Sequence, residues 1–156
     1  MALTKLNNQS RPKSTGEVIQ VVRTYNANSG FINTTNTSFT ASGITAAITP
    51  TTSGNIILID FVVPLADAEA DTMHVKMYQL ISGGSYALMT GGGLYHSGIQ
   101  VSGNNRYSAI TFSGSYTTTS TSQLTYQPYF ASVGGGDVRL VHSGSSYSLT
   151  LTEIAA

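Results

Sequence analysis

The sequence predicts an all-β protein, an antiparallel, jelly-roll-like β-sandwich with an extended N-terminal arm. First, segments rich in β-branched and aromatic residues recur about every ten residues between glycine-rich turns such as Gly83-Gly84 and Gly134-Gly135-Gly136. Second, only 9% of the residues are charged whereas 40% are hydrophobic, so the chain has the apolar residues that disordered polar tracts lack. Third, no apolar pattern with a helical period is sustained anywhere.

The first predicted strands occupy residues 17–25, 38–43, 44–50 and 55–63. The last of these is the most apolar segment of the chain, which favours a central strand with both faces covered. The segment PLADAEAD, residues 64–71, follows it and is the one place where a helical turn is expected.

Later strands are expected from Thr72 onward. Residues 72–81 alternate, with Met73, Val75 and Met77 on one face. Further strands are predicted at 85–90, 106–114, 123–132, 137–141 and 147–155, which gives eight to ten strands in all. The run Ser113–Ser122 is interpreted as a long exposed loop. The residues predicted to form the core are Val18, Val21, Ile57, Ile59, Phe61, Phe112, Leu140, Leu149 and Leu151.

Residues 1–16 form the predicted arm, and residues 17–156 form the sandwich domain. The arm contains Lys5, Arg11 and Lys13 and no acidic residue, together with Leu3 and Leu6. It is either a frayed terminus or a segment that becomes ordered on a partner.

Composition excludes several classes of partner and compartment. The net charge is zero and the pI is about 6.8, which argues against nucleic-acid binding and against binding to an anionic membrane surface. There is no cysteine, and no secretion signal is visible at the start of the chain. The sequence therefore predicts synthesis in a host cytoplasm and release without a signal peptide.

No motif for catalysis, metal or cofactor binding stands out. His74, His96 and His142 lack ligand spacing, and no nucleophile-elbow motif is present, so no catalytic residue and no cofactor is predicted. Asp67, Glu69 and Asp71 alternate as calcium ligands can, but the pattern favours a solvated acidic loop. Such a loop could instead contact the basic arm of a neighbouring subunit.

Four tyrosines lie close to turns rich in glycine and serine: Tyr86, Tyr95, Tyr107 and Tyr116. A tyrosine there can stack on a sugar or anchor a protein contact, because it combines a rigid apolar ring with a polar tip. The competing interpretation is that each one covers the core of the sandwich.

Three stretches carry a resemblance to a known family: GEVIQVVRTY, the segment from Ile44 to Leu58 with its I-T-P motif, and the closing L-T-L-T-E-I-A from Leu149 to Ala155. With the opening MALTKLNNQS, they resemble small β-sandwich virion structural proteins of tailed marine and cyanobacterial bacteriophages. The resemblance implies a structural role in the virion and no catalysis.

Three functions remain as hypotheses. The first is a capsid decoration (cement) protein on the capsid exterior, with the major capsid protein and its own copies in a homotrimer as partners. Leu3, Lys5, Leu6, Arg11 and Lys13 would then form the capsid contact. The second is a tail-fibre or receptor-binding subunit that recognises a bacterial surface glycan. The third, an enzyme, would need a pair of carboxylates such as Asp60, Asp137 or Glu153.

Overall fold

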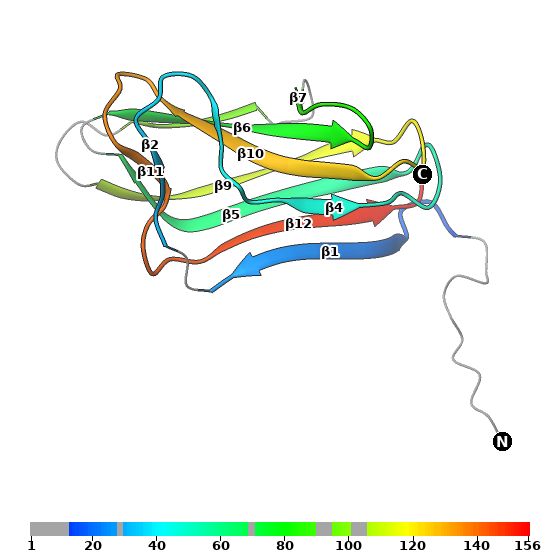
Figure 1. Ribbon diagram of the computed structural model, residues 1–156. Coiled ribbons are helices and arrows are strands. Elements are labelled where there is room, and N and C mark those ends of the chain that lie inside the picture. The colour runs from blue at the N-terminus through cyan, green and yellow to red at the C-terminus, as the bar shows by residue number, and fades with distance from the viewer. Residues whose placement is uncertain (1–12, 28–29, 69–70, 90–94, 101–105) are drawn as a thin grey trace.

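The computed structural model shows two antiparallel β-sheets packed face to face (Figure 1). It describes residues 13–27, 30–68, 71–89, 95–100 and 106–156, with residues 95–100, 106 and 112 described by their backbone alone. No helix occurs among these residues, and accordingly none of their elements is a helix long and apolar enough to cross a membrane. The prediction of an all-β antiparallel sandwich is confirmed.

Twelve strands make up the two sheets. They are β1 (Val18–Asn26), β2 (Ile32–Thr34), β3 (Thr40–Ala41), β4 (Ala46–Ile48), β5 (Ile56–Ala68), β6 (Thr72–Ile81), β7 (Ala87–Leu88), β8 (Tyr95–Gln100), β9 (Arg106–Thr117), β10 (Leu124–Ser132), β11 (Val138–Val141) and β12 (Tyr147–Ile154). One sheet, sheet A, has the order β1-β12-β5-β11-β2, with β9 also paired to β5. The other, sheet B, has the order β3-β10-β6-β7, with β4 paired to β10 and β8 to β6.

The core lies between the sheets. On β5, Ile57, Ile59 and Phe61 are fully buried and belong to the same cluster as Met73 and Met77 of β6. Period-two alternation places these side chains on the inner faces, as the sequence predicts for β6. Leu140, Leu149 and Leu151 are also fully buried, while the side chain of Phe112 lies outside the described residues.

The prediction that Val18 and Val21 belong to the core is wrong. Their side chains are 52% and 58% exposed. The pairing of β1 with β12 is interrupted between Val18 and Gln20, so Ile19 is an extra residue on β1. Such a bulge reverses the alternation, and the side chains of Gln20 and Val22 take the partly buried positions instead.

Two predictions for β5 are also wrong. Its outer face is not covered, because the side chains of Asp60 and Pro64 are exposed. No helical turn begins at Pro64, since β5 continues to Ala68. The register with β9 shifts between Val63 and Ala66, and a bulge is where a strand can accept a proline, which has no N–H to donate.

The first half of the serine- and threonine-rich run is strand, and residues 118–122 lie outside strands. β9 continues to Thr117, so Ser113 and Ser115 lie in sheet A, contrary to the predicted loop. The strand count of eight to ten is too low. Five strands have four residues or fewer, and two strands, β2 and β8, were not predicted at all.

Candidate functional site

The predicted capsid-binding residues of the arm lie mostly outside the described residues. Leu3, Lys5, Leu6 and Arg11 are in the segment 1–12, and only Lys13 is described. The Nζ atom of Lys13 lies 3.6 Å from Oε1 of Glu17. The N–H of Gly16 donates to the carbonyl of Ala155, and the N–H of Ala155 donates to the carbonyl of Glu17, so backbone bonds hold this point of the chain against the sandwich.

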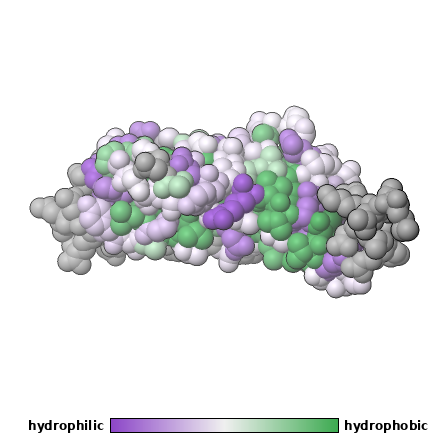
Figure 2. Space-filling model, turned by 90° about the horizontal axis from the view of Figure 1, so that it is seen from below, coloured by the Kyte–Doolittle hydropathy of each residue, from purple (hydrophilic) through white to green (hydrophobic). Residues whose placement is uncertain are grey.

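The outer face of sheet A has three features that can bind a partner. The first is the β1 strip, which we define as Val18, Val21 and Tyr25. All three side chains are more than half exposed on the strand at the edge of the sheet. Figure 2 views the molecule from below, onto the edge formed by β1, and shows hydrophobic side chains gathered in the right half of that view. Arg23 lies within the strip, between Val21 and Tyr25 on the same face of β1, and its guanidinium is 4.7 Å from the ring centroid of Tyr25.

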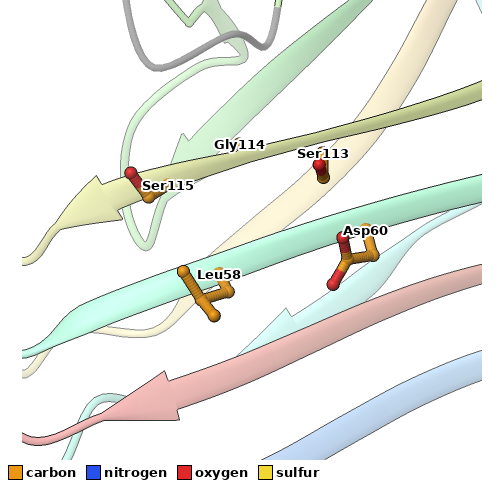
Figure 3. A pocket seen from close by; sticks show the side chains of 5 residues that line it. All are labelled: Leu58, Asp60, Ser113, Gly114 and Ser115. Atoms are coloured by element: carbon orange, nitrogen blue, oxygen red, sulfur yellow. The ribbon is translucent and has the colours of Figure 1, made fainter. Parts of the chain in front are cut away.

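The second feature is a shallow pocket of about 280 Å³, the Asp60 pocket. Leu58 and Asp60 of β5 and residues 113–115 of β9 line it (Figure 3). Ser113 pairs directly with Asp60, and Ser115 with Leu58, so their side chains lie on the same outer face. The side chains of Asp60, Ser113 and Ser115 have no hydrogen-bond or ion-pair partner among the described residues.

The third feature is the aromatic cluster, defined as Phe31, Tyr107 and His142. The ring of His142 meets both others edge-on, with centroid distances of 5.0 Å to Phe31 and 5.2 Å to Tyr107. Phe31 is 54% exposed and Tyr107 is 53% exposed. The cluster therefore presents two large aromatic side chains to solvent at the end of the sandwich where β2 and β11 lie (Figure 1).

A row of charged groups runs beside the aromatic cluster. Arg139 of β11 pairs in register with Asp67 of β5, which in turn pairs with Tyr107 of β9. The guanidinium of Arg139 donates to Asp67 Oδ2 at 2.8 Å and to Asp137 Oδ2 at 2.9 Å, and it lies 5.2 Å from the ring centroid of Phe31. Asp67 is fully buried, and its Oδ1 has no partner among the described residues. The two hydrogen bonds to Asp67 and Asp137 therefore hold the guanidinium of Arg139 next to the exposed ring of Phe31.

The three acidic residues considered as calcium ligands do not converge in the described part of the chain. Asp67 forms the ion pair with Arg139, Glu69 lies outside the described residues, and Asp71 serves a different loop. No group of three potential metal ligands occurs among the described residues. Asp67 is therefore not part of the solvated loop that the sequence favoured, because it lies in β5 and is fully buried.

Asp71 holds the glycine-rich loop 134–136. Its carboxylate accepts hydrogen bonds from the Oγ of Ser132 and from the backbone N–H groups of Gly134 and Gly136, the latter at 2.8 Å. Gly135 between them has φ +87°, a conformation that glycine adopts without strain. Desolvation alone would raise the pKa of Asp71, but these bonds and the N–H of Thr72 together lower it from 3.8 to about 2.

Glu153 is a fully buried carboxylate that neutral donors surround. It accepts bonds from Gln20 Nε2 at 2.6 Å, from both the N–H and the hydroxyl of Thr51 at 2.8 Å, and from Asn55 Nδ2 at 2.6 Å. Desolvation opposes its ionisation, yet the bonds from Asn55, Gln20 and Thr51 lower its pKa below the ordinary range. Its role is to join β1, the turn before β5 and the end of β12.

The carboxylates considered for an enzyme stand apart from one another. Glu153 pairs with Ile57 and points to the inner face, whereas Asp60 is exposed on the outer face. Asp137 belongs to the charged row beside the aromatic cluster, near the far end of β5 from Asp60. These three carboxylates, all within the described residues, therefore do not form a facing pair of the kind that glycoside hydrolysis uses.

The four candidate tyrosines lie in different places. Tyr107 belongs to the aromatic cluster, and Tyr116 packs against the core. Tyr86 lies 6.0 Å from Tyr129 on sheet B, where desolvation and the neighbouring Tyr129 raise its pKa. The side chain of Tyr95 lies outside the described residues.

The sequence did not predict that Phe31, His142 and Arg139 contribute to a surface site. It placed Ser113 and Ser115 in a loop, whereas both lie in β9. Phe31 and His142 come from segments that are far apart in the chain, so no local pattern connects them. The serines had a detectable signal. Serine at positions 113 and 115 continues the period-two pattern of the preceding strand, which predicts two hydroxyls on one face.

Comparison with known proteins finds no matching family model and no matching curated protein. Among solved structures, the chain is similar to one in a structure of infectious bursal disease virus Gx strain, at 10% identity and a TM-score of 0.47. That match covers 97% of this chain and 37% of the viral chain. The chain is also similar to the CBM22-1 xylan-binding domain of Xyn10C from Paenibacillus barcinonensis, at 11% identity and a TM-score of 0.40. That match covers 94% of this chain and 99% of the domain. Neither similarity identifies a family for this chain.

Proposed function

We propose that the protein is a non-enzymatic structural protein of a tailed-phage virion, a decoration (cement) protein that binds the major capsid protein from outside. The β1 strip is the single observation that carries this proposal. It is an exposed apolar surface on an edge strand, and the basic segment 1–16 leads directly into it.

An apolar edge of this kind favours a protein partner. In the described residues β1 pairs only with β12, so its other edge presents unpaired backbone groups beside exposed valines. Natural sheets guard such edges with charge, and the outward side chains of β1 offer only Arg23. Burial of the two valines against a capsid subunit would contribute about 25 cal/mol for each Å² of apolar surface removed from water.

The test is addition of the purified protein to undecorated capsids. The variant Val18→Ser/Val21→Ser should bind at least about tenfold more weakly, because two apolar contacts worth more than about 1.4 kcal/mol together are lost. Val133→Ser is the matched control, since Val133 is also 53% exposed but lies outside the strip. Undiminished binding of the double variant would show that the strip is not the interface.

The arm is tested separately by deletion of residues 2–14. Its basic residues would contact acidic or carbonyl-rich capsid groups, so binding of the full-length chain should weaken as salt rises. If the deletion variant binds with unchanged affinity, the arm is not the anchor. Copy number in purified virions, hundreds for a cement protein and far fewer for a fibre, distinguishes the two virion positions.

The aromatic cluster favours a second candidate function, recognition of a bacterial surface glycan by a tail-fibre or receptor-binding subunit. The exposed rings of Phe31 and Tyr107 can stack on sugar faces, beside the polar side chains of Asp137 and Arg139. Phe31→Ala/Tyr107→Ala should reduce retention on immobilised host-envelope polysaccharide. Tyr25→Ala, which removes a ring that is 55% exposed elsewhere, should not. Equal retention of the unaltered chain, Phe31→Ala/Tyr107→Ala and Tyr25→Ala would contradict this candidate.

A further inference from the structure

We propose that the Asp60 pocket is a subsite for one ring of a neutral polyhydroxylated ligand, a saccharide unit. The inference deepens the second candidate function by naming a site on the same face of sheet A. The pocket is lined by one carboxylate, two hydroxyls and one aliphatic side chain (Figure 3). Its volume of about 280 Å³ lies near the lower end of the range for ligand pockets, so it suits a single ring.

The polar groups of the pocket are available to a ligand. The carboxylate of Asp60 and the hydroxyls of Ser113 and Ser115 have no side-chain partner among the described residues. A carboxylate has two acceptor oxygens that can take two O–H donors from adjacent sugar hydroxyls, while a serine hydroxyl both donates and accepts. Leu58 supplies an apolar contact for the C–H groups of a ring.

The surroundings of the pocket favour a neutral ligand with hydroxyl groups. On the β12 side, Thr150 pairs with Asp60 and Thr152 pairs with Leu58, so hydroxyl groups border the pocket on both sides. Among the described residues, Arg23 comes next in that row, opposite Thr150 on β1. Two strand spacings, about 10 Å, separate it from Asp60, and its guanidinium lies over Tyr25.

The pocket is poorly suited to a metal ion. Calcium takes about 6–8 oxygen ligands, preferably with several carboxylates, and Asp60 is the one carboxylate lining the pocket. An ammonium group could pair with Asp60 but would leave the hydroxyls and Leu58 without a role. A sugar ring uses all the lining side chains.

The test is titration of the ¹⁵N-labelled full chain with single sugars, followed by backbone amide shifts. The probes are methyl α-mannopyranoside, methyl β-galactopyranoside and methyl β-glucopyranoside, each to about 100 mM because a single ring is expected to bind weakly. At least one glycoside should cause saturable shifts at Leu58, Asp60, Ser113 and Ser115. Calcium chloride and methylammonium chloride are titrated in parallel.

Variants separate the pocket from nonspecific effects. Asp60→Asn should weaken binding about tenfold, because a charged acceptor is lost, and Ser113→Ala several-fold. Ser85→Ala is the control, since Ser85 is exposed in the turn before β7 and has no partner among the described residues. The spectra themselves report whether each variant is folded.

The outcomes distinguish this subsite from the broader function. Shifts confined to Phe31, Tyr107 and His142 would overturn the subsite but leave glycan recognition in place. Saturation by calcium or methylammonium alone would assign the pocket to a cation and overturn the proposal. The absence of localised shifts with every glycoside would also overturn it, and the polysaccharide column would then decide the second candidate function on its own.

Discussion

The side-chain amide of Asn55 donates a hydrogen bond of 2.6 Å to the buried carboxylate of Glu153. Asn55 immediately precedes β5, and Glu153 lies near the end of β12, so this bond joins two segments separated by almost 100 residues. It also connects the I-T-P region with the closing E-I-A segment of the chain. The buried carboxylate of Glu153 therefore ties the start of β5 to the end of β12.

Glu153→Gln should destabilise the protein by about 1–3 kcal/mol. The new amide N–H group would face donors from Asn55, Thr51 and Gln20, so at least one buried donor would lose its acceptor. The urea midpoint of unfolding measures the effect. Asp60→Asn is the control, because an exposed carboxylate without partners should change stability by less than about 0.5 kcal/mol. Equal midpoints for the two variants would show that the buried acceptor is dispensable.

Acid should destabilise the loop that Asp71 holds. The pKa of Asp71 is lowered from 3.8 to about 2 in the folded protein, so its contribution is fully present above pH 3.8. That contribution is lost as the pH falls from 3.8 toward 2, and the lowered pKa of Glu153 acts in the same direction. Unfolding midpoints measured through this range should fall more steeply for the native chain than for Asp71→Asn. Parallel curves would contradict the assignment.

Substitutions test the corrected register of β1. Val21→Ala should change the free energy of unfolding by less than about 0.5 kcal/mol, because its side chain is already exposed. Ile59→Ala should cost about 2–5 kcal/mol, since it leaves a cavity at a fully buried position. Chemical denaturation of both variants measures the difference. A large loss of stability in Val21→Ala would instead support the core position predicted for Val21 from the sequence.

We expect self-association as a homotrimer through edge strands other than β1, since the β1 strip is assigned to the capsid contact. Burial of β2 in sheet A and of β3 or β7 in sheet B between copies would cover edges that are unpaired among the described residues and that a lone sandwich leaves in water. Light scattering on the purified protein at micromolar concentration measures the mass. A single species of 16.4 kDa would count against a stable trimer. If a trimer forms, Val18→Ser/Val21→Ser should leave its mass unchanged, because the β1 strip lies outside the proposed contacts between copies.

The sequence by itself determined the fold class and most of the long strands. Alternation at Met73, Val75 and Met77 identifies the inner face of β6, because side chains along a strand project to opposite faces. The buried positions of Phe61, Leu140 and Leu151 follow from the same local rule. Such patterns are visible in a few consecutive residues and need no knowledge of the partner strand.

The tertiary structure alone decided register and the candidate sites. The bulge at Ile19 depends on how β1 pairs with β12, so the exposure of Val18 and Val21 could not be read from β1 itself. The meeting of Phe31 with His142 likewise requires pairing between segments far apart in the chain. Register and cross-strand neighbours are set by long-range pairing, whereas the period of a strand is a local property of the chain.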